Sequence, residues 1–131
     1  MDWQQVFSDI DQNEGRFDFR IRRTQLEGSL PSSLFFPGNT ENQNLYRFHI
    51  QDNPNLGGEL PQNIGDIFIN NNNIKYFRIT QNNFSGTIPQ SICNYLNAPS
   101  LQLNYFNLRV NQLCPPYPDC LTENMVNNQD F

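Results

Sequence analysis

The chain has 131 residues, of which eight are basic and thirteen acidic, and its formal net charge is −5. This length fits one domain, which can bury roughly two thirds of its unfolded surface and fold alone. The acidic balance excludes a uniformly basic nucleic-acid binder, and no apolar run approaches the roughly 18 residues that a membrane-spanning helix needs. Residues 1–10 hold two acidic residues and no basic one, so we expect no signal peptide in this chain.

An amphipathic helix is predicted over residues 2–11. Apolar residues recur there at the spacing of one helix face, and they are Trp3, Val6, Phe7 and Ile10. Asp2 followed three residues later by Gln5 resembles a capping box. We therefore assign residues 1–15 to an N-terminal cap that covers the open end of the core behind it.

Four segments then follow one template, and each closes on a proline. They span residues 17–31, 45–61, 74–89 and 103–118, so the closing prolines are spaced by 30, 28 and 29 residues. The alternation Phe77-x-Ile79 in the third segment is the period of a strand with one buried face. A single strand of this kind cannot bury its apolar face, whereas stacked copies can. The sequence therefore predicts a solenoid of four repeats over residues 16–120.

One asparagine recurs at a fixed position of the template, where we expect the chain to leave the strand. The residues are Asn53, Asn82 and Asn111, while Thr24 replaces the asparagine in the first repeat. An amide can both donate to and accept from backbone groups of adjacent coils, which predicts a buried ladder of these side chains. The second repeat carries an extra residue around Pro54.

Each return from a closing proline to the next repeat has 13 or 14 residues when the proline is counted, and the returns are rich in asparagine. We expect them to be irregular or 3-10 helical and to lie on the convex side of the solenoid. Four apolar side chains of these returns are expected to fill the convex half of the core, and they are Phe35, Phe36, Ile67 and Ile69.

The pattern LxxLxLxxNxLxGxIP resembles the plant-type leucine-rich repeat of polygalacturonase-inhibitor proteins and receptor-kinase ectodomains. The run from Ser91 to Cys93 and the ending from Asn111 to Cys120 are similar to short microbial secreted repeat proteins. The resemblance implies an α/β leucine-rich-repeat solenoid with one parallel strand per coil on a concave sheet, formed by a single domain over residues 1–131. Residues 121–131 would form its C-terminal cap. The paired cysteines of the plant N-terminal cap are missing here.

The chain has three cysteines, Cys93, Cys114 and Cys120. Cys114 and Cys120 bracket the segment PPYPD, and the closing loop of the family is similar, so we predict a disulfide between them. Pairing of Cys93 with Cys114 is the alternative. Because disulfides persist in oxidising compartments, we expect a secreted or cell-surface protein.

The sequence offers no assembled catalytic group. His49 is the only histidine, and it lies at an outward strand position with Asp52 three residues on. No nucleophile shares its face, and no carboxylate pair, metal-ligand cluster or phosphate-binding glycine loop is present in the sequence. We therefore predict no catalytic residue, no metal, no cofactor, and a protein that is not an enzyme.

Positive charge gathers on the outward positions of the predicted strands. Seven of the eight basic residues fall there against Asp18 and Asp52, a net +5 that leaves −10 for the rest of the chain. Arginine and tyrosine are enriched at interface hot spots, and a basic surface attracts an anionic partner. The predicted ligand-binding residues are Arg20, Arg22, Arg47, His49, Tyr76, Arg78, Tyr105 and Arg109. We expect Arg20, Arg47, Arg78 and Arg109 to be largely exposed.

The leading interpretation is a non-enzymatic recognition module that binds an acidic protein partner through this concave sheet, as the resemblance to inhibitors and receptor ectodomains implies. One alternative is an anionic polysaccharide, bound by arginine to carboxylate or sulfate and by tyrosine stacking on sugar. Another is a structural or adhesive repeat of a larger surface protein. We expect a monomer that binds no nucleic acid.

Overall fold

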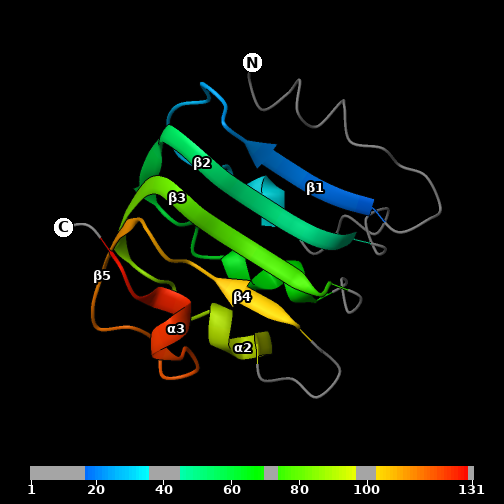
Figure 1. Cartoon of the computed structure of the whole chain (residues 1–131). Coiled ribbons are helices and arrows are strands. Elements are labelled where there is room, and N and C mark those ends of the chain that lie inside the picture. The colour runs from blue at the N-terminus through cyan, green and yellow to red at the C-terminus, as the bar shows by residue number, and fades with distance from the viewer. Residues whose placement is uncertain (1–16, 36–44, 70–73, 97–102, 130–131) are drawn as a thin grey trace.

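The computed structural model describes residues 17–35, 45–69, 74–96 and 103–129, and these build a parallel sheet (Figure 1). Its strands β1 (Phe17–Arg22), β2 (Leu45–Glu59), β3 (Tyr76–Thr87) and β4 (Tyr105–Asn107) lie side by side in chain order, and β5 (Gln112–Cys114) also pairs with β3. The helices η1 (Ser32–Phe35), η3 (Ile64–Phe68), α2 (Ile92–Leu96) and α3 (Glu123–Val126) are short. The predicted parallel solenoid is confirmed. The N-terminal capping helix predicted over residues 2–11 lies outside the described residues.

The core stacks the same position of successive coils. Phe19, Phe48, Phe77 and Phe106 are register partners, and their rings stack at centroid distances of 5.1, 5.2 and 5.1 Å with interplanar angles of 8°, 11° and 7°. All four side chains are buried. Aromatic pairs at such distances add about 0.5–1.5 kcal/mol beyond the burial of their area. The ring stack thus links all four coils through one continuous column of the core.

The predicted asparagine ladder links adjacent coils through side-chain hydrogen bonds. Asn53 Nδ2 donates to the Ile21 carbonyl of the preceding coil at 3.1 Å, and Asn53 Oδ1 accepts from Thr24 N at 3.0 Å and from Thr24 Oγ1 at 2.8 Å. The same donation recurs one coil on from Asn82, at 3.0 Å, and again from Asn111, at 2.9 Å. Asn53 and Asn111 are buried as predicted, whereas Asn82 is half-buried. In the first coil, Thr24 occupies the ladder position and donates to Asn53, the ladder residue of the second coil.

Strands β2 and β3 do not end at the ladder, contrary to the prediction, whereas β1 ends at Arg22 and β4 at Asn107, before their ladder positions. The residue before each ladder position has a left-handed backbone, with φ between 54° and 61° at Arg23, Asp52, Gln81 and Val110. The chain bends there, and parallel pairing resumes in a second leg, where Gly57 pairs with Asn83 and β3 pairs with β5. The register shifts between Asn53 and Gly57, in the stretch that carries the extra residue around Pro54. The later coils thus have two paired legs joined at a bend, and the first coil pairs beyond its bend through the bridge from Gly28 to Leu56.

The convex half of the core comes from the returns, as expected, but one predicted residue is wrong. Phe35 and Ile67 are buried, whereas Ile69 is 36% exposed. Phe68 takes its place and packs against Phe77 with ring centroids 5.4 Å apart. Ile69 follows the last residue of η3 and so lies past the turn that faces the core. Phe36 lies outside the described residues. None of the helices in the described part of the chain has the length and apolar character of a membrane-spanning helix.

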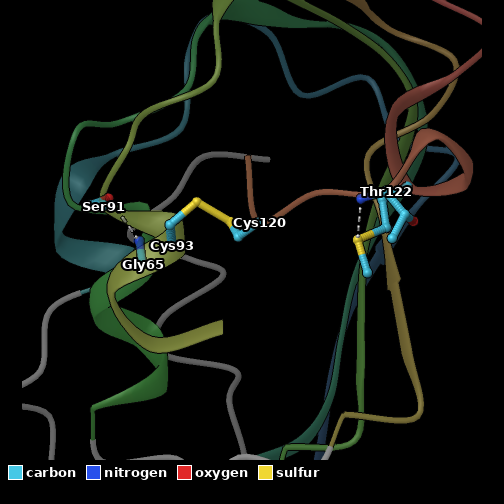
Figure 2. The surroundings of a disulfide bond; sticks show 6 residues. Gly65, Ser91, Cys93, Cys120 and Thr122 are labelled. Atoms are coloured by element: carbon cyan, nitrogen blue, oxygen red, sulfur yellow. Dashed lines mark hydrogen bonds between the residues drawn. A yellow bond between two sulfur atoms is a disulfide. The ribbon is translucent and has the colours of Figure 1, made fainter. Parts of the chain in front are cut away.

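The disulfide joins Cys93 to Cys120, with Cα atoms 5.6 Å apart, so both the predicted Cys114–Cys120 pair and its alternative are wrong. Figure 2 shows this bond linking α2 to the segment before α3. Cys114 is free because it belongs to β5, where its backbone pairs with Thr87. Proximity along the chain favoured the short loop, whereas stacking of the coils brings together the returns that follow Pro89 and Pro118.

Close packing of two returns depends on Gly65. Its N–H donates to Ser91 Oγ at 3.2 Å, and the two residues face each other in Figure 2. A Cβ atom at Gly65 would lie 2.6 Å from the Ser91 carbonyl carbon, a separation that real contacts do not reach. Only glycine therefore lets η3 approach α2 this closely.

The segment after the last coil closes the solenoid with a glutamine. Gln129 Oε1 accepts from Leu113 N at 2.9 Å, and Gln129 Nε2 donates to the carbonyls of Leu108 and Val126 at 3.0 and 2.8 Å. Val126 is buried, and the predicted capping residues Leu121 and Met125 pack against the core. One side chain thus supplies the hydrogen bonds that a further ladder residue would make.

Replacement of Asn53 by Ala should destabilise the fold by about 2–4 kcal/mol, because it leaves several buried backbone groups without partners. Asn55→Ala, in the same strand, should change stability by no more than about 0.5 kcal/mol, since Asn55 is exposed and, among the described residues, its side chain bonds only to the exposed Gln25 side chain. Urea denaturation of both variants measures the difference. Equal losses would contradict a ladder that holds the coils together.

Peptide mapping without reduction should recover Cys93 linked to Cys120 and an alkylatable Cys114. Replacement of Cys93 by Ser should cost about 3–4 kcal/mol of stability, because the bond closes a loop with a sequence separation of 27. Cys114→Ser should cost far less and serves as the control. Recovery of a peptide that links Cys114 to Cys120 would overturn the observed pairing.

Candidate functional site

The register of the sheet sorts the predicted binding residues into two rows across the strands. We call the side of β1–β4 that points away from the phenylalanine stack the outward face. One row is Asp18, Arg47, Tyr76 and Tyr105, and the next is Arg20, His49, Arg78 and Asn107. Arg22 follows in register with Gln51 and Thr80, and Arg109 lies two residues beyond β4.

In the half of the outward face over β1 and β2, two carboxylates lie beside three of the four arginines. Asp18 lies 3.3 Å from Arg20 and 3.4 Å from Arg47, and Asp52 lies 3.5 Å from Arg23. These carboxylates offset the positive charge of their partners, although such solvated pairs contribute only about 0–1 kcal/mol each to stability. Arg20 and Arg47 are therefore less available to an anionic partner than the sequence suggested.

Arg47 is further held by two tyrosine rings. Its Cζ lies 4.8 Å from the ring centroid of Tyr46 and 4.8 Å from that of Tyr76, and the two rings meet edge to face at 5.6 Å. Such cation–π contacts contribute about 0.5–2 kcal/mol each. Of the four arginines expected to be largely exposed, only Arg20 is exposed, and the other three are half-buried.

The half of the outward face over β3 and β4 is organised around Arg78. Its Nη1 donates to Gln51 Oε1 at 3.2 Å, its Nη2 donates to the Tyr105 hydroxyl at 3.0 Å, and its Cζ lies 4.8 Å from the Tyr105 ring centroid. Asn107 Nδ2 also donates to the Tyr105 hydroxyl, at 2.6 Å, and Asn107 Oδ1 accepts from Arg109 N at 2.8 Å. No ion pair with Arg78 or Arg109 occurs among the described residues.

A cavity of about 170 Å³ opens within this network, and we call it the Arg78 cavity. It is lined by Gln51, Arg78, Thr80, Gln81, Tyr105, Asn107, Arg109 and Val110. Sequence reasoning selected only the arginines and the tyrosine, because amides and a threonine carry no charge signal. Their outward alternation in neighbouring strands was the signal that could have found them. The lining contains two guanidinium groups and no carboxylate.

His49 lies between Arg20 and Arg78 in its row. Burial, together with the neighbouring charges of Arg78, Arg20 and Arg47, lowers the pKa of His49 from 6.5 to about 4, while Asp18 opposes the shift. Its Nε2 is buried and has no hydrogen-bond partner among the described residues. His49 is therefore neutral at pH 7, and the charge of the face comes from its arginines and Lys75.

Tyr105 is also perturbed. Burial raises the pKa of its phenol, but hydrogen bonds from Asn107 and Arg78 and the charges of Arg78 and Arg109 outweigh burial, so this pKa lies below its usual value of 10. A phenol with a lowered pKa is a stronger hydrogen-bond donor. The Tyr105 hydroxyl is thus prepared to donate to an acceptor in the Arg78 cavity.

Metal binding has no support in the described ranges, where no group of three or more His, Cys, Asp or Glu side chains is placed to hold an ion. Guanidinium groups surround the titratable residues of the outward face and would repel a cation. The chemistry open to this face is the binding of an anion.

The paired strand, ladder asparagine and closing turn of each coil give this chain the fold of a plant-type leucine-rich-repeat protein, as the sequence resemblance implied. A scan of protein-family models and a search of curated proteins find no match. Among solved structures, the chain is similar to a TDR receptor, with 26% identity and a TM-score of 0.53 over 73% of this chain and 14% of that chain.

Two further structures, both from Arabidopsis thaliana, are similar to this chain at lower identity. The BIR2 ectodomain is 18% identical with a TM-score of 0.51, and the BIR3–SERK2 complex is 19% identical with a TM-score of 0.47. Each alignment covers 84% of this chain and 66% of the other chain. The chain therefore spans only part of each of the solved proteins named here, and the likeness concerns the fold.

Stability should fall as the pH drops from 7 to 5, because the unfolded chain binds a proton at His49 near pH 6.5 and the folded chain only near pH 4. Between those values, each step down in pH favours the unfolded state. His49→Gln removes this contribution to the pH dependence of stability, and the chain has no other histidine that could replace it. Thermal denaturation at pH 7, 6 and 5 should therefore show a smaller loss in the variant, and parallel losses would refute the assignment.

Proposed function

We propose that this chain is a non-enzymatic recognition module that binds a protein partner with an acidic patch through its outward face. The observation that carries the proposal is the Arg78 cavity, whose lining holds two guanidinium groups and no carboxylate in a chain of net charge −5. A positive site in a negative chain attracts anionic groups to one place and in one orientation. The likeness to a TDR receptor, a protein that by its title is a receptor, supports a recognition role.

The arginines of this face are pre-organised for binding. Arg78 is fixed by Gln51 and by Tyr105, so little side-chain freedom remains to be lost when a partner binds. Arginine and tyrosine in such packed arrangements are the residues that most often dominate interface energies. The binding centre is therefore Arg78, Tyr105 and Arg109, with the other predicted residues at its margin. Those residues are Arg20, Arg22, Arg47, His49 and Tyr76.

An anionic polysaccharide is the less favoured partner. Stacking of a sugar needs an open face of a tyrosine ring, and Arg47 already covers one face each of Tyr46 and Tyr76 while Arg78 covers one face of Tyr105. Sugar hydroxyls also need acceptors as well as donors. A protein carboxylate needs donors alone, which this face supplies.

The same proposal places the protein outside the cell or at its surface. The Cys93–Cys120 disulfide supports this location, because such bonds persist in oxidising compartments. We further propose that residues 1–131 form one domain that acts as a monomer.

Arg78→Gln should weaken binding of a glutamate-rich peptide by about tenfold or more, which corresponds to the 1–3 kcal/mol typical of a buried interface arginine. Wild-type affinity should also fall with added salt, because charges in solution are screened beyond roughly 8 Å at physiological ionic strength. Isothermal titration at 50 and 300 mM salt measures both effects. Polygalacturonate, tested in parallel, should bind more weakly than the peptide.

Gln62→Glu is the matched control, because it changes the net charge by the same amount at an exposed position before η3. It should leave peptide binding unchanged, and both variants should retain the wild-type melting temperature within a few degrees. The proposal fails if Arg78→Gln binds the peptide as well as wild type, or if both variants weaken binding equally.

A further inference from the structure

The orientations of the amides in the Arg78 cavity follow from their partners. Arg78 has only donors, so the atom of Gln51 that it contacts at 3.2 Å is Oε1, and Gln51 Nε2 must donate to Gln81 Oε1 at 2.9 Å. The backbone N–H of Arg109 likewise needs an acceptor, which fixes Asn107 Oδ1 there at 2.8 Å and turns Asn107 Nδ2 toward Tyr105. Each amide oxygen of this network thus already accepts one hydrogen bond.

The Tyr105 hydroxyl has a single remaining role. Its oxygen accepts from Arg78 Nη2 at 3.0 Å and from Asn107 Nδ2 at 2.6 Å, which uses both of its lone pairs. Its own hydrogen can therefore only point away from these two groups. Among the described residues, no acceptor is found for this hydroxyl hydrogen, and Tyr105 lines the Arg78 cavity.

Donors are left over elsewhere in the cavity as well. The Nε atoms of Arg78 and Arg109 are buried and have no hydrogen-bond partner among the described residues. Gln81 Nε2 is left over once Gln81 Oε1 accepts from Gln51. The lining therefore presents two positive charges and several N–H and O–H donors without a partner, beside one remaining lone pair on each amide oxygen and the Thr80 hydroxyl. An anion that accepts hydrogen bonds suits the charge and the donors of this lining.

We propose that the Arg78 cavity is a subsite for one carboxylate of an aspartate or glutamate side chain on the partner, an inference that rests on the proposed function. The carboxylate accepts from the Tyr105 hydroxyl and from the guanidinium groups of Arg78 and Arg109, and such charge-assisted bonds are about twice as strong as neutral ones. Val110, exposed at 39% on the rim, lies where it can contact the aliphatic stem of that side chain.

A sulfate shares the acceptor-only chemistry of a carboxylate but comes on a hydroxyl-rich sugar. Each amide oxygen of the lining already accepts one bond, so fewer acceptors than donors remain for the hydrogens of sugar hydroxyls. The donor surplus and the apolar rim together favour the carboxylate of a protein.

The test uses the free full-length chain and small anions. Propionate is titrated at constant ionic strength while the Nε–H signals of Arg78 and Arg109 are followed by ¹H–¹⁵N NMR, and sulfate is titrated in parallel. Propionate should give saturable shifts at both signals. Tyr105→Phe should weaken propionate binding by about fivefold or more, as expected for loss of a hydrogen bond to a charged group. Tyr117→Phe, which removes a hydroxyl away from the outward face, should change binding less than about twofold.

A second readout needs no variant. A carboxylate bound beside the phenol makes loss of its proton more costly, so saturating propionate should raise the pKa of Tyr105 in the wild-type chain. The subsite is refuted if propionate gives no saturable shift, if sulfate binds and propionate does not, if the pKa of Tyr105 does not rise, or if the two tyrosine variants lose affinity equally. Propionate binding without any binding of the glutamate-rich peptide would instead refute the proposed function and leave the subsite standing.

Discussion

The hydrogen bonds of the asparagine ladder set how each coil lies on the one before it. Asn53 and Asn82 donate to the carbonyls of Ile21 and Ile50 in the preceding coils, and Asn53 N donates back to Asn82 Oδ1 at 3.0 Å. These groups are buried or half-buried, so a coil that slipped by one residue would leave them unpaired in the interior. Variation in length is therefore confined to places off the ladder. The extra residue near Pro54 lies just beyond Asn53. The returns, which differ in length, lie on the convex side of the solenoid.

The fixed register has a direct consequence for the outward face. Because every strand is offset from its neighbour by 29 residues along the ladder, equivalent outward positions form rows, and a row of basic residues brings like charges together. In the row of Arg20, His49 and Arg78, the central residue stays neutral at pH 7, because burial and then the neighbouring arginines lower its pKa to about 4. A third cation at that position would add repulsion that no carboxylate in the row offsets. The neutral histidine lets two arginines share one row.

Repetition made much of this architecture predictable from the sequence. The spacing of Phe48, Phe77 and Phe106 defined the strands, and the recurrence of Asn82 and Asn111 defined the ladder. The strands and the ladder could both be predicted from the period of the repeats alone. The bend before each ladder residue was missed because residues as different as Asp52 and Val110 adopt the same left-handed backbone, which composition does not reveal.

What escaped prediction depends on contacts between coils. The partner of Cys120 is 27 residues away in the chain and one coil away in space, so chain proximity pointed to the wrong cysteine. The pattern of charges showed a basic face, but only side-chain geometry shows that Asp18 serves both Arg20 and Arg47. The Arg78 cavity depends on how the amides of Gln51 and Asn107 are turned, and no spacing encodes that.

The two halves of the outward face therefore differ in what a partner can gain from them. Over β1 and β2, an incoming carboxylate would compete with Asp18 for Arg20 and Arg47, and the exchange of one carboxylate for another yields little free energy. Over β3 and β4, the guanidinium of Arg78 is held by a neutral amide and a neutral hydroxyl, so a carboxylate there adds charge pairing without displacing any. The chain as a whole carries a net charge of −5, which repels an anionic partner at long range. Since screening limits that repulsion to about 8 Å at physiological salt, the local donors of the Arg78 cavity, rather than the field of the whole chain, decide where the partner binds.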